Sequence, residues 1–167
     1  TKGGRVIMTT TTTTKTNKTA KTAKKAAASQ RSPRAHVRTI GEVMTDQPYT
    51  IGRDQKLSRA HEMMREHKLR HLPVLEHGQL VGVLTQRDLY FLETISGVSI
   101  DEDHVDDAMS PDAYAVSPDT PLGEVAETML ERKLGCAVIV ERDRVAGIFT
   151  ATDALKLIAQ SERGTRH

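Results

Sequence analysis

The sequence contains very few cysteine and aromatic residues. Among its 167 residues there are one cysteine, Cys136, no tryptophan, three tyrosines and two phenylalanines. A single cysteine excludes a disulfide within the chain and a zinc site built from several cysteines. So few aromatic rings also exclude the usual stacking surface for single-stranded nucleic acids.

Long apolar runs are absent as well. No run approaches the roughly 18 residues that a membrane-spanning helix requires, and the apolar stretch 6–8 is too short for a secretory signal. We therefore expect a cytoplasmic protein that does not cross a membrane. At about 150 residues per domain, the length fits one domain or two very small ones.

Charge is divided unevenly along the chain. Residues 1–38 contain ten Lys/Arg and no Asp/Glu, whereas residues 39–167 contain 14 Lys/Arg and 22 Asp/Glu, so the two parts carry charges of +10 and −8. The first part has low complexity and an unbroken threonine run, and we expect a disordered basic tail. Three roles fit it: a solvated tail, a targeting segment, or an arm that binds nucleic acid or another polyanion through residues 15–38.

The strongest signal is an internal repeat with an offset of 65 residues. From residue 44 to residue 92 the two copies align without a gap. The identical pairs include Met44/Met109, Tyr49/Tyr114, Asp54/Asp119, Leu57/Leu122, Met64/Met129, Gly82/Gly147, Thr85/Thr150 and Asp88/Asp153. So many matches in one register indicate a tandem duplication.

Each copy predicts the order βαββα. The predicted elements are extended segments at 49–51 and 114–116, helices from 57 and 122, strands at 72–75, 80–84, 136–140 and 145–149, and second helices after Thr85 and Thr150. His77-Gly78 is a hairpin signal, and Thr120-Pro121 is expected to start a helix as N-cap and first residue. Because one copy buries little surface alone, we expect an α/β (α+β) fold whose two copies pack through their sheets around one core as a pseudo-two-fold module.

The motifs resemble those of a tandem CBS-domain pair, or Bateman module, of the stand-alone type. The resemblance covers residues 39–160 and is carried by the segments 43–45, 70–74, 82–88, 108–110 and 147–153. A Gly-h-x-Thr-x-x-Asp string, in which h is apolar, occurs in both copies at the repeat offset. We divide the chain into the tail 1–38, a first CBS domain 39–95, an acidic linker 96–103, a second CBS domain 104–160 and a C-terminal tail 161–167.

This resemblance implies a regulatory protein that is not an enzyme. It implies an adenosine-containing ligand, such as AMP, ADP, ATP, NAD or S-adenosylmethionine, bound in the cleft between the repeats. It also implies signalling to a partner protein, which the sequence does not identify, and the repeated module favours a homodimer. We expect no catalytic cofactor and no metal site.

The Thr-x-x-Asp spacing after each second strand has two interpretations. Thr85 with Asp88, and Thr150 with Asp153, can form a capping box at the start of a helix, with no ligand involved. The same geometry presents free N–H groups to a phosphate and a carboxylate to ribose hydroxyls. The resemblance favours the second role, and the two roles can coexist.

The candidate ligand residues form two groups. For ribose and phosphate we expect Arg70, His71, Thr85, Arg87, Asp88, Thr150, Thr152 and Asp153. By resemblance, adenine contacts mix the repeats: Met44, Tyr49 and Leu69 would serve the pocket of Asp153, and Met109, Tyr114 and Leu134 the pocket of Asp88. Copy two has Gly135 and Cys136 where copy one has Arg70 and His71, so we expect unequal sites.

Three further interpretations concern metal, redox chemistry and function. His67 and His71 are four residues apart, but His71 is expected in a strand, so their spacing does not indicate a metal site. Cys136, between apolar residues, is expected to pack in a core.

The alternative functions are a ligand-free adaptor that dimerises, and a nucleic-acid-associated protein that uses the basic tail.

Overall fold

Residues 37–94 and 99–164 are described by the computed structural model, and they belong to one unit of the chain, residues 35–167. Nearly all of the expected basic tail lies outside the described residues. The start of the expected linker, residues 96–98, and the end of the expected C-terminal tail, residues 165–167, also lie outside them.

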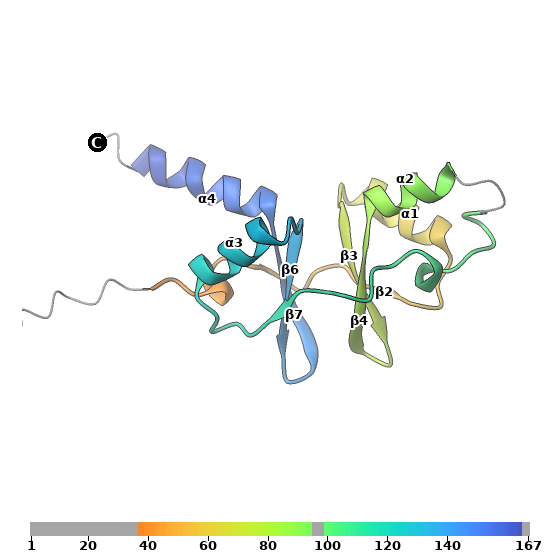
Figure 1. Cartoon of the computed structure of the whole chain (residues 1–167), viewed down its shortest axis with the longest axis horizontal. Coiled ribbons are helices and arrows are strands. Elements are labelled where there is room, and N and C mark those ends of the chain that lie inside the picture. Colours follow the sequence, from red (N-terminus) through yellow and green to blue (C-terminus); the bar gives the residue numbers. More distant parts are fainter. Residues whose placement is uncertain (1–36, 95–98, 165–167) are drawn as a thin grey trace, which may run out of the picture. The chain divides into compact units, whose positions relative to one another are not determined.

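The two halves of the described chain contain their elements in the same order (Figure 1), except that the strand β1 of the first half has only an isolated bridge at Ser110 as its counterpart in the second. The first half has η1 (Ile40–Glu42), β1 (Thr45–Asp46), β2 (Ile51–Gly52), α1 (Leu57–Glu66), β3 (His71–Glu76), β4 (Gln79–Thr85) and α2 (Gln86–Glu93). The second has η2 (Val105–Asp107), β5 (Ala115–Val116), α3 (Leu122–Glu131), β6 (Cys136–Glu141), β7 (Arg144–Thr150) and α4 (Ala151–Gly164). Both bounds of α1, β3 and β4 recur 65 residues later in α3, β6 and β7, so the predicted mixed α/β repeat is confirmed.

Each predicted hairpin closes with a two-residue turn. His77 and Gly78 have φ angles of 50° and 83° between the paired ends of β3 and β4. In the second copy Arg142 and Asp143 have φ angles of 51° and 60°. Two successive positive φ values are typical of the type I′ turn, whose twist matches that of the flanking strands. Glycine adopts this conformation freely, whereas the second copy relies on an aspartate, which tolerates it.

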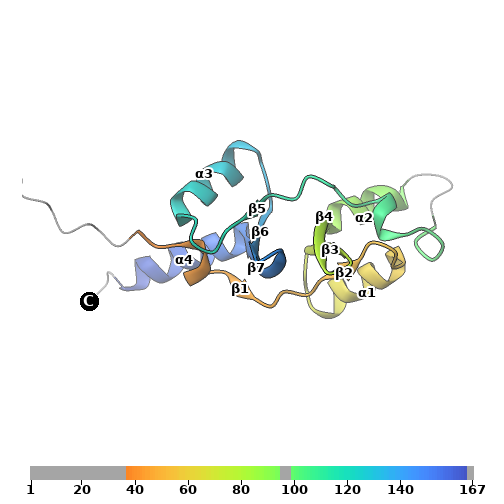
Figure 2. The same cartoon turned by 90° about the horizontal axis from the view of Figure 1, so that it is seen from below.

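The short segments at the start of each repeat are exchanged between the two sheets. One sheet has the order β1-β7-β6-β5 and the other β2-β3-β4. β1 lies at the start of the first repeat but pairs with β7 of the second, with Thr45 opposite Ile148 (Figure 2). Ser110, 65 residues after Thr45, pairs in turn with Val83 of β4 through N–H···O bonds of 2.9 Å in both directions. The sequence did not predict this exchange.

Backbone hydrogen bonds extend the exchange to the helix starts. The N–H of Leu122 donates to the carbonyl of Arg38 at 2.9 Å, and the N–H of Ser58 donates to that of Ile100 at 2.7 Å. The prediction that Thr120 caps α3 and Pro121 is its first residue was wrong by one position. Pro121 is the N-cap, with φ −57° and ψ 131°, and its side chain makes no capping bond. The exchanged segment supplies a backbone acceptor there instead.

The core is divided into three clusters rather than one. The first-repeat cluster is formed by Ile51, Leu57, Ala60, Met63, Met64, Leu72, Val74, Leu84, Leu89 and Val105. The second-repeat cluster is formed by Ile40, Val125, Met129, Ala137, Ile139 and Phe149. Each therefore contains one residue of an exchanged segment, Val105 or Ile40. A smaller cluster joins the two sheets, because Val83 of β4 packs with Cys136, Val138 and Ile148 of β6 and β7.

Two strand glycines lie where the exchanged segments approach. A Cβ at Gly82 would lie 2.6 Å from the carbonyl oxygen of Ser110 and 2.9 Å from Met109 Sδ. A Cβ at Gly147 would collide with Met44 Sδ. A glycine inside a strand often marks a close approach of backbone or ligand. The approaching group in this structure is the exchanged segment.

Gly82→Ala is expected to destabilise the fold by about 1–3 kcal/mol, because the new methyl group overlaps a backbone carbonyl that cannot move without breaking the bridge to Val83. Urea unfolding followed by circular dichroism measures the change. Gly123→Ala is the matched control, since nothing lies within 4 Å of its Cβ position in α3. That control should stabilise by about 0.5–1 kcal/mol. Equal effects of the two substitutions would contradict the close approach.

Candidate ligand-binding site

The two strands that carry the repeated glycines lead directly into helix N-termini. β4 ends at Thr85, which is the N-cap of α2, and β7 ends at Thr150, before α4. The carbonyls of Arg70 and Gly135 accept hydrogen bonds from the first helical N–H groups, those of Gln86 and Ala151, at 2.9 and 3.1 Å. The two N-termini are therefore built alike by their own repeats.

Each N-terminus contains a complete capping box. In the first repeat the Thr85 N–H and Oγ1 donate to Asp88 Oδ2 at 3.0 and 2.6 Å, and the Asp88 N–H donates to Thr85 Oγ1 at 3.2 Å. In the second repeat Thr150 and Asp153 make the same three bonds at 3.0, 2.6 and 3.3 Å. The capping interpretation of the motif is thus confirmed. The box uses only the Oδ2 atom of each aspartate, and Oδ1 takes no part in it.

The basic residues expected at the phosphate lie around the first N-terminus. His71 begins β3 opposite Thr85, whereas Arg70 and Arg87 are exposed. Burial lowers the pKa of the His71 imidazole, and the positive charges of Arg70 and Arg87 lower it further, against the opposing charge of Asp88. The imidazole is therefore mostly uncharged at neutral pH in the absence of an anion.

His71 also reaches the other repeat. A Cβ at Gly135 would collide with His71 Nε2, so the imidazole fits against the second repeat only because residue 135 has no side chain. Gly135 and Cys136 occupy the positions equivalent to Arg70 and His71. Cys136 is buried, and its burial raises the pKa of the thiol to about 11. Thr152, equivalent to Arg87, is exposed on α4. The second N-terminus thus lacks three basic groups that the first has.

The methionines expected near adenine lie against the opposite repeat. Met44 packs on the second-repeat cluster beside Gly147 of β7, three residues before Thr150. Met109 packs on the first-repeat cluster beside Gly82 of β4. The structure therefore brings each methionine to the strand that leads to the other copy's capping box.

The other four expected adenine residues contact their own repeats. Leu69 packs on the first-repeat cluster, and Leu134 and Tyr114 pack on the second. The ring of Tyr49 is half-exposed and stacks on His67, with centroids 3.8 Å apart and planes inclined by 15°. No contact that the structure gives joins Tyr49 or Leu69 to Asp153, or Tyr114 or Leu134 to Asp88.

Sequence reasoning missed the residues that cover the tyrosines. The guanidinium of Arg132 lies 5.7 Å from the centroid of the Tyr114 ring, and residue 132 is the repeat equivalent of His67. Each tyrosine is thus covered by the C-cap residue of the first helix in its own repeat, which is His67 for α1 and Arg132 for α3. The 65-residue offset pairs positions 67 and 132. The sequence did not point to a shared role for them, because one is a histidine and the other an arginine.

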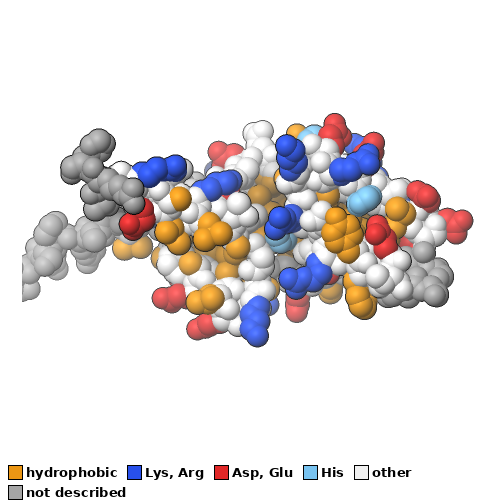
Figure 3. All heavy atoms as spheres, turned by 90° about the horizontal axis from the view of Figure 1, so that it is seen from above, with side chains coloured by type: hydrophobic (Ala, Val, Ile, Leu, Met, Phe, Trp, Pro, Cys, Tyr) orange, Lys and Arg blue, Asp and Glu red, His pale blue; other side chains and the backbone are white. Residues whose placement is uncertain are grey.

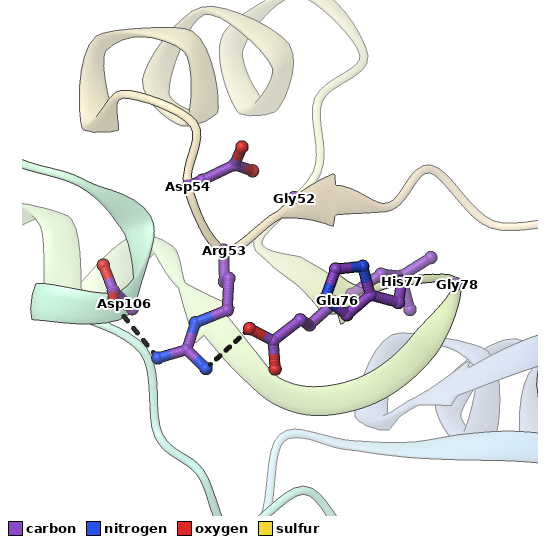
Figure 4. A pocket seen from close by; sticks show the side chains of 8 residues that line it. Gly52, Arg53, Asp54, Glu76, His77, Gly78 and Asp106 are labelled. Carbon is purple, nitrogen blue, oxygen red and sulfur yellow. Dashed lines mark hydrogen bonds and ion pairs between the residues drawn. The ribbon is translucent and has the colours of Figure 1, made fainter.

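A pocket of about 660 Å³ lies elsewhere, at the turn of the first hairpin (Figure 4). Arg53 projects into it and bonds to Glu76 at 3.1 Å and to Asp106 at 3.2 Å. The carboxylates of these partners raise the pKa of Arg53. The pocket contains none of the expected ligand residues.

Within the described residues no group of three potential ligands could hold a metal ion, and no helix is long and apolar enough to cross a bilayer.

The exchanged βαββα repeats with paired capping boxes define a tandem two-domain module. The family model described as "CBS domain" matches residues 40–92 and 105–160. This chain therefore belongs to the CBS-domain family and contains two copies, which confirms the resemblance seen in the motifs. Proteins with such a pair are generally regulatory rather than catalytic.

Three similar proteins illustrate the family. CBS domain-containing protein YhcV of Bacillus subtilis is 27% identical over 115 residues, which cover 69% of this chain and 81% of that protein. A putative acetoin utilization protein, AcuB, of Vibrio cholerae has a TM-score of 0.69 and 28% identity, covering 76% of this chain and 94% of its own. CBSX2 in complex with AMP has a TM-score of 0.66 and 27% identity, and the match covers 74% of this chain and 98% of that chain. The chain spans only about a fifth to a quarter of several enzymes that it also matches.

Proposed function

We propose that this protein is a non-catalytic regulator that binds an adenosine-containing ligand between its two CBS domains and transmits its occupancy to a partner protein. One observation carries the proposal: at the N-terminus of α2, Asp88 Oδ1 accepts no hydrogen bond from any residue that the structure describes. The carboxylate is already oriented by Thr85, so its second oxygen is available to ribose hydroxyls. The relative CBSX2, bound to AMP, supports a ligand of this class.

The phosphate of a nucleotide would find two kinds of donor near Asp88. The first-turn N–H groups of α2 and the helix dipole favour an anion. Arg70, Arg87 and His71 would add charge-assisted hydrogen bonds, and an anion would favour the protonated imidazole of His71. Because His71 also rests on Gly135, a ligand held there would be coupled to the second repeat.

The competing function is a ligand-free adaptor. The complete capping boxes favour it, because they account for the Thr and Asp residues without a ligand. In an adaptor the two N-termini would only stabilise helices, and no adenosine compound would bind. A ligand screen separates the two functions directly.

An adenosine ligand is expected to raise the melting temperature of the protein. A ligand present at 100 times its dissociation constant adds about 2.7 kcal/mol of stability if it binds only the folded state. Differential scanning fluorimetry with millimolar AMP, ATP, NAD and S-adenosylmethionine measures the shift. CMP is the control, because it keeps the ribose and phosphate but lacks adenine. An unchanged melting temperature with all four compounds would favour the adaptor.

The protein is also proposed to form a homodimer through α2 and α4. Four large apolar side chains are exposed on these helices: Tyr90 (51%), Phe91 (66%), Leu155 (67%) and Ile158 (59%). Figure 3 shows apolar side chains among lysines and arginines on the face that carries the helices. Exposed apolar surface of this kind marks interaction sites, and closed two-fold dimers are the commonest assemblies of identical chains.

Light scattering should therefore give about twice the 18.4 kDa of one chain. Tyr90→Glu combined with Ile158→Glu should shift the mass to that of a monomer, because each substitution would bury a charge in the interface. Leu130→Glu, on the 80% exposed position of α3, is the control and should leave the dimer intact. A monomeric wild-type protein would refute the proposal.

A further inference from the structure

The two repeat-equivalent aspartates differ in the use of their second carboxylate oxygen. Asp153 Oδ1 accepts a hydrogen bond from Lys156 Nζ at 2.9 Å, whereas Asp88 Oδ1 accepts none from the described part of the chain. The difference originates in one sequence position. The residue three places after the aspartate is Lys156 in α4 and Phe91 in α2.

Helix geometry holds the lysine over the carboxylate. Residues three apart lie on the same helix face, so Lys156 reaches back to Asp153 within one turn. The Asp153 side chain is only 14% exposed, while that of Lys156 is 64% exposed. Burial alone would raise the pKa of Asp153, but hydrogen bonds from Thr150 and Lys156 outweigh it and hold the pKa below its usual range. The carboxylate is thus ionised and has partners on both oxygens.

Resting on the function proposed above, we propose that Lys156 is a specificity-determining residue that competes with ribose hydroxyls for Asp153, so that the first-repeat site fills at lower ligand concentration than the second. Both sites would take the same class of ligand. The lysine would separate their affinities and spread the response over a wider range of ligand concentration.

The competition follows from the acceptor capacity of a carboxylate. Its two oxygens offer about four acceptor positions, and Thr150 uses two of them on Oδ2. A ribose brings two hydroxyl donors to Oδ1, where Lys156 already makes a charge-assisted bond. Exposed ion pairs are weak because solvent screens them. Displacing the ammonium should therefore cost only about two- to fivefold in affinity.

The test is calorimetric titration of the full chain with adenosine, which has ribose hydroxyls but no phosphate that could bind the lysine instead. Asp88→Ala isolates the second-repeat site, because a methyl group cannot accept ribose hydroxyls. In this background Lys156→Gln should tighten adenosine binding about two- to fivefold. Arg163→Gln, with the same change of charge on the same helix, is the matched control and should leave the affinity unchanged.

A second ligand distinguishes competition from a general effect of charge or packing. For 2′,3′-dideoxyadenosine, which lacks both hydroxyls, Lys156→Gln should leave the affinity unchanged. Equal gains for both nucleosides, or no gain for adenosine, would overturn the inference.

The companion variant Asp153→Ala, which lacks an acceptor for the ribose in the second repeat, separates this inference from the proposed function. Adenosine binding to that variant reports on the first-repeat site alone. If it binds there and Lys156→Gln has no effect on the other site, only the role of Lys156 is refuted. If adenosine binds to neither site in any variant, the proposed function and the role of Lys156 both fail.

Discussion

Phe149→Ala is expected to lower the free energy of unfolding by about 3–5 kcal/mol, the largest effect of any substitution considered. Phe149 is 1% exposed and lies in the second-repeat cluster with Ile40, Val125 and Ile139. Removing its ring takes away apolar burial and leaves a cavity, because β6 and β7 are held by their ladder of hydrogen bonds and cannot close over it. Domains of this size are stable by only about 5–15 kcal/mol, so the loss is a large fraction of the total.

Chemical denaturation of the wild type and the variant measures this loss. Leu130→Ala is the control, since this leucine of α3 is 80% exposed and its removal should change stability by less than about 0.5 kcal/mol. The first-repeat cluster should unfold in the same transition, because Ile40 and Val105 are exchanged between the repeats. A second, separate transition for the first repeat would show that the two clusters are energetically independent.

Asp88→Ala and Asp153→Ala are each expected to remove one class of ligand site, with a loss of about ten- to hundred-fold in affinity. A methyl group cannot accept ribose hydroxyls, and a hydrogen bond to a charged group contributes roughly 1.5–3 kcal/mol. The site lost with Asp88 should be the tighter one, because only the first repeat supplies Arg70, His71 and Arg87. Calorimetric titration with AMP measures both affinities.

Capping alone predicts a different pattern for the same variants. Both would lose about 1 kcal/mol of stability, and ligand affinity would not change. Asp112→Ala, an exposed aspartate for which the described contacts give no partner, controls for the loss of one negative charge. Two identical sites, or unchanged binding in both aspartate variants, would reject the assignment of these carboxylates to the ligand.

Much of the fold could be predicted because each local sequence pattern occurs twice, at the same offset. The helix from Leu57 and the hairpin turn at His77-Gly78 follow from local patterns, and the second copy repeats them at the same offset. The pairing of β1 with β7 could not be predicted in this way. β1 is two residues long and its partner lies about 100 residues away, so neither periodicity nor turn chemistry reports the contact.

The sequence predicted the types of residue in the candidate site better than it predicted how these residues are arranged in space. The Thr-x-x-Asp spacing correctly predicted the capping boxes, because a box depends on backbone geometry within four residues. Lys156 was missed, since a lysine near an aspartate on an exposed helix usually indicates only a solvated ion pair. Its importance becomes visible when Asp153 is compared with Asp88. The start of α3 was misplaced because the acceptor for its first N–H group comes from Arg38, in a segment remote in sequence.

The exchanged segments also bear on how such a chain could have arisen. A single ancestral repeat would expose the edge of its strand β4 and lack the apolar residue, Ile40 or Val105, that the other copy supplies. Two separate copies could have completed each other by the same exchange, as in a domain-swapped dimer. Fusion into one chain then replaces a concentration-dependent encounter with a tethered one, at an effective concentration that a short linker sets near the millimolar range. The duplication would thus have made permanent, at any cellular concentration, a folding partnership that once depended on meeting a second molecule.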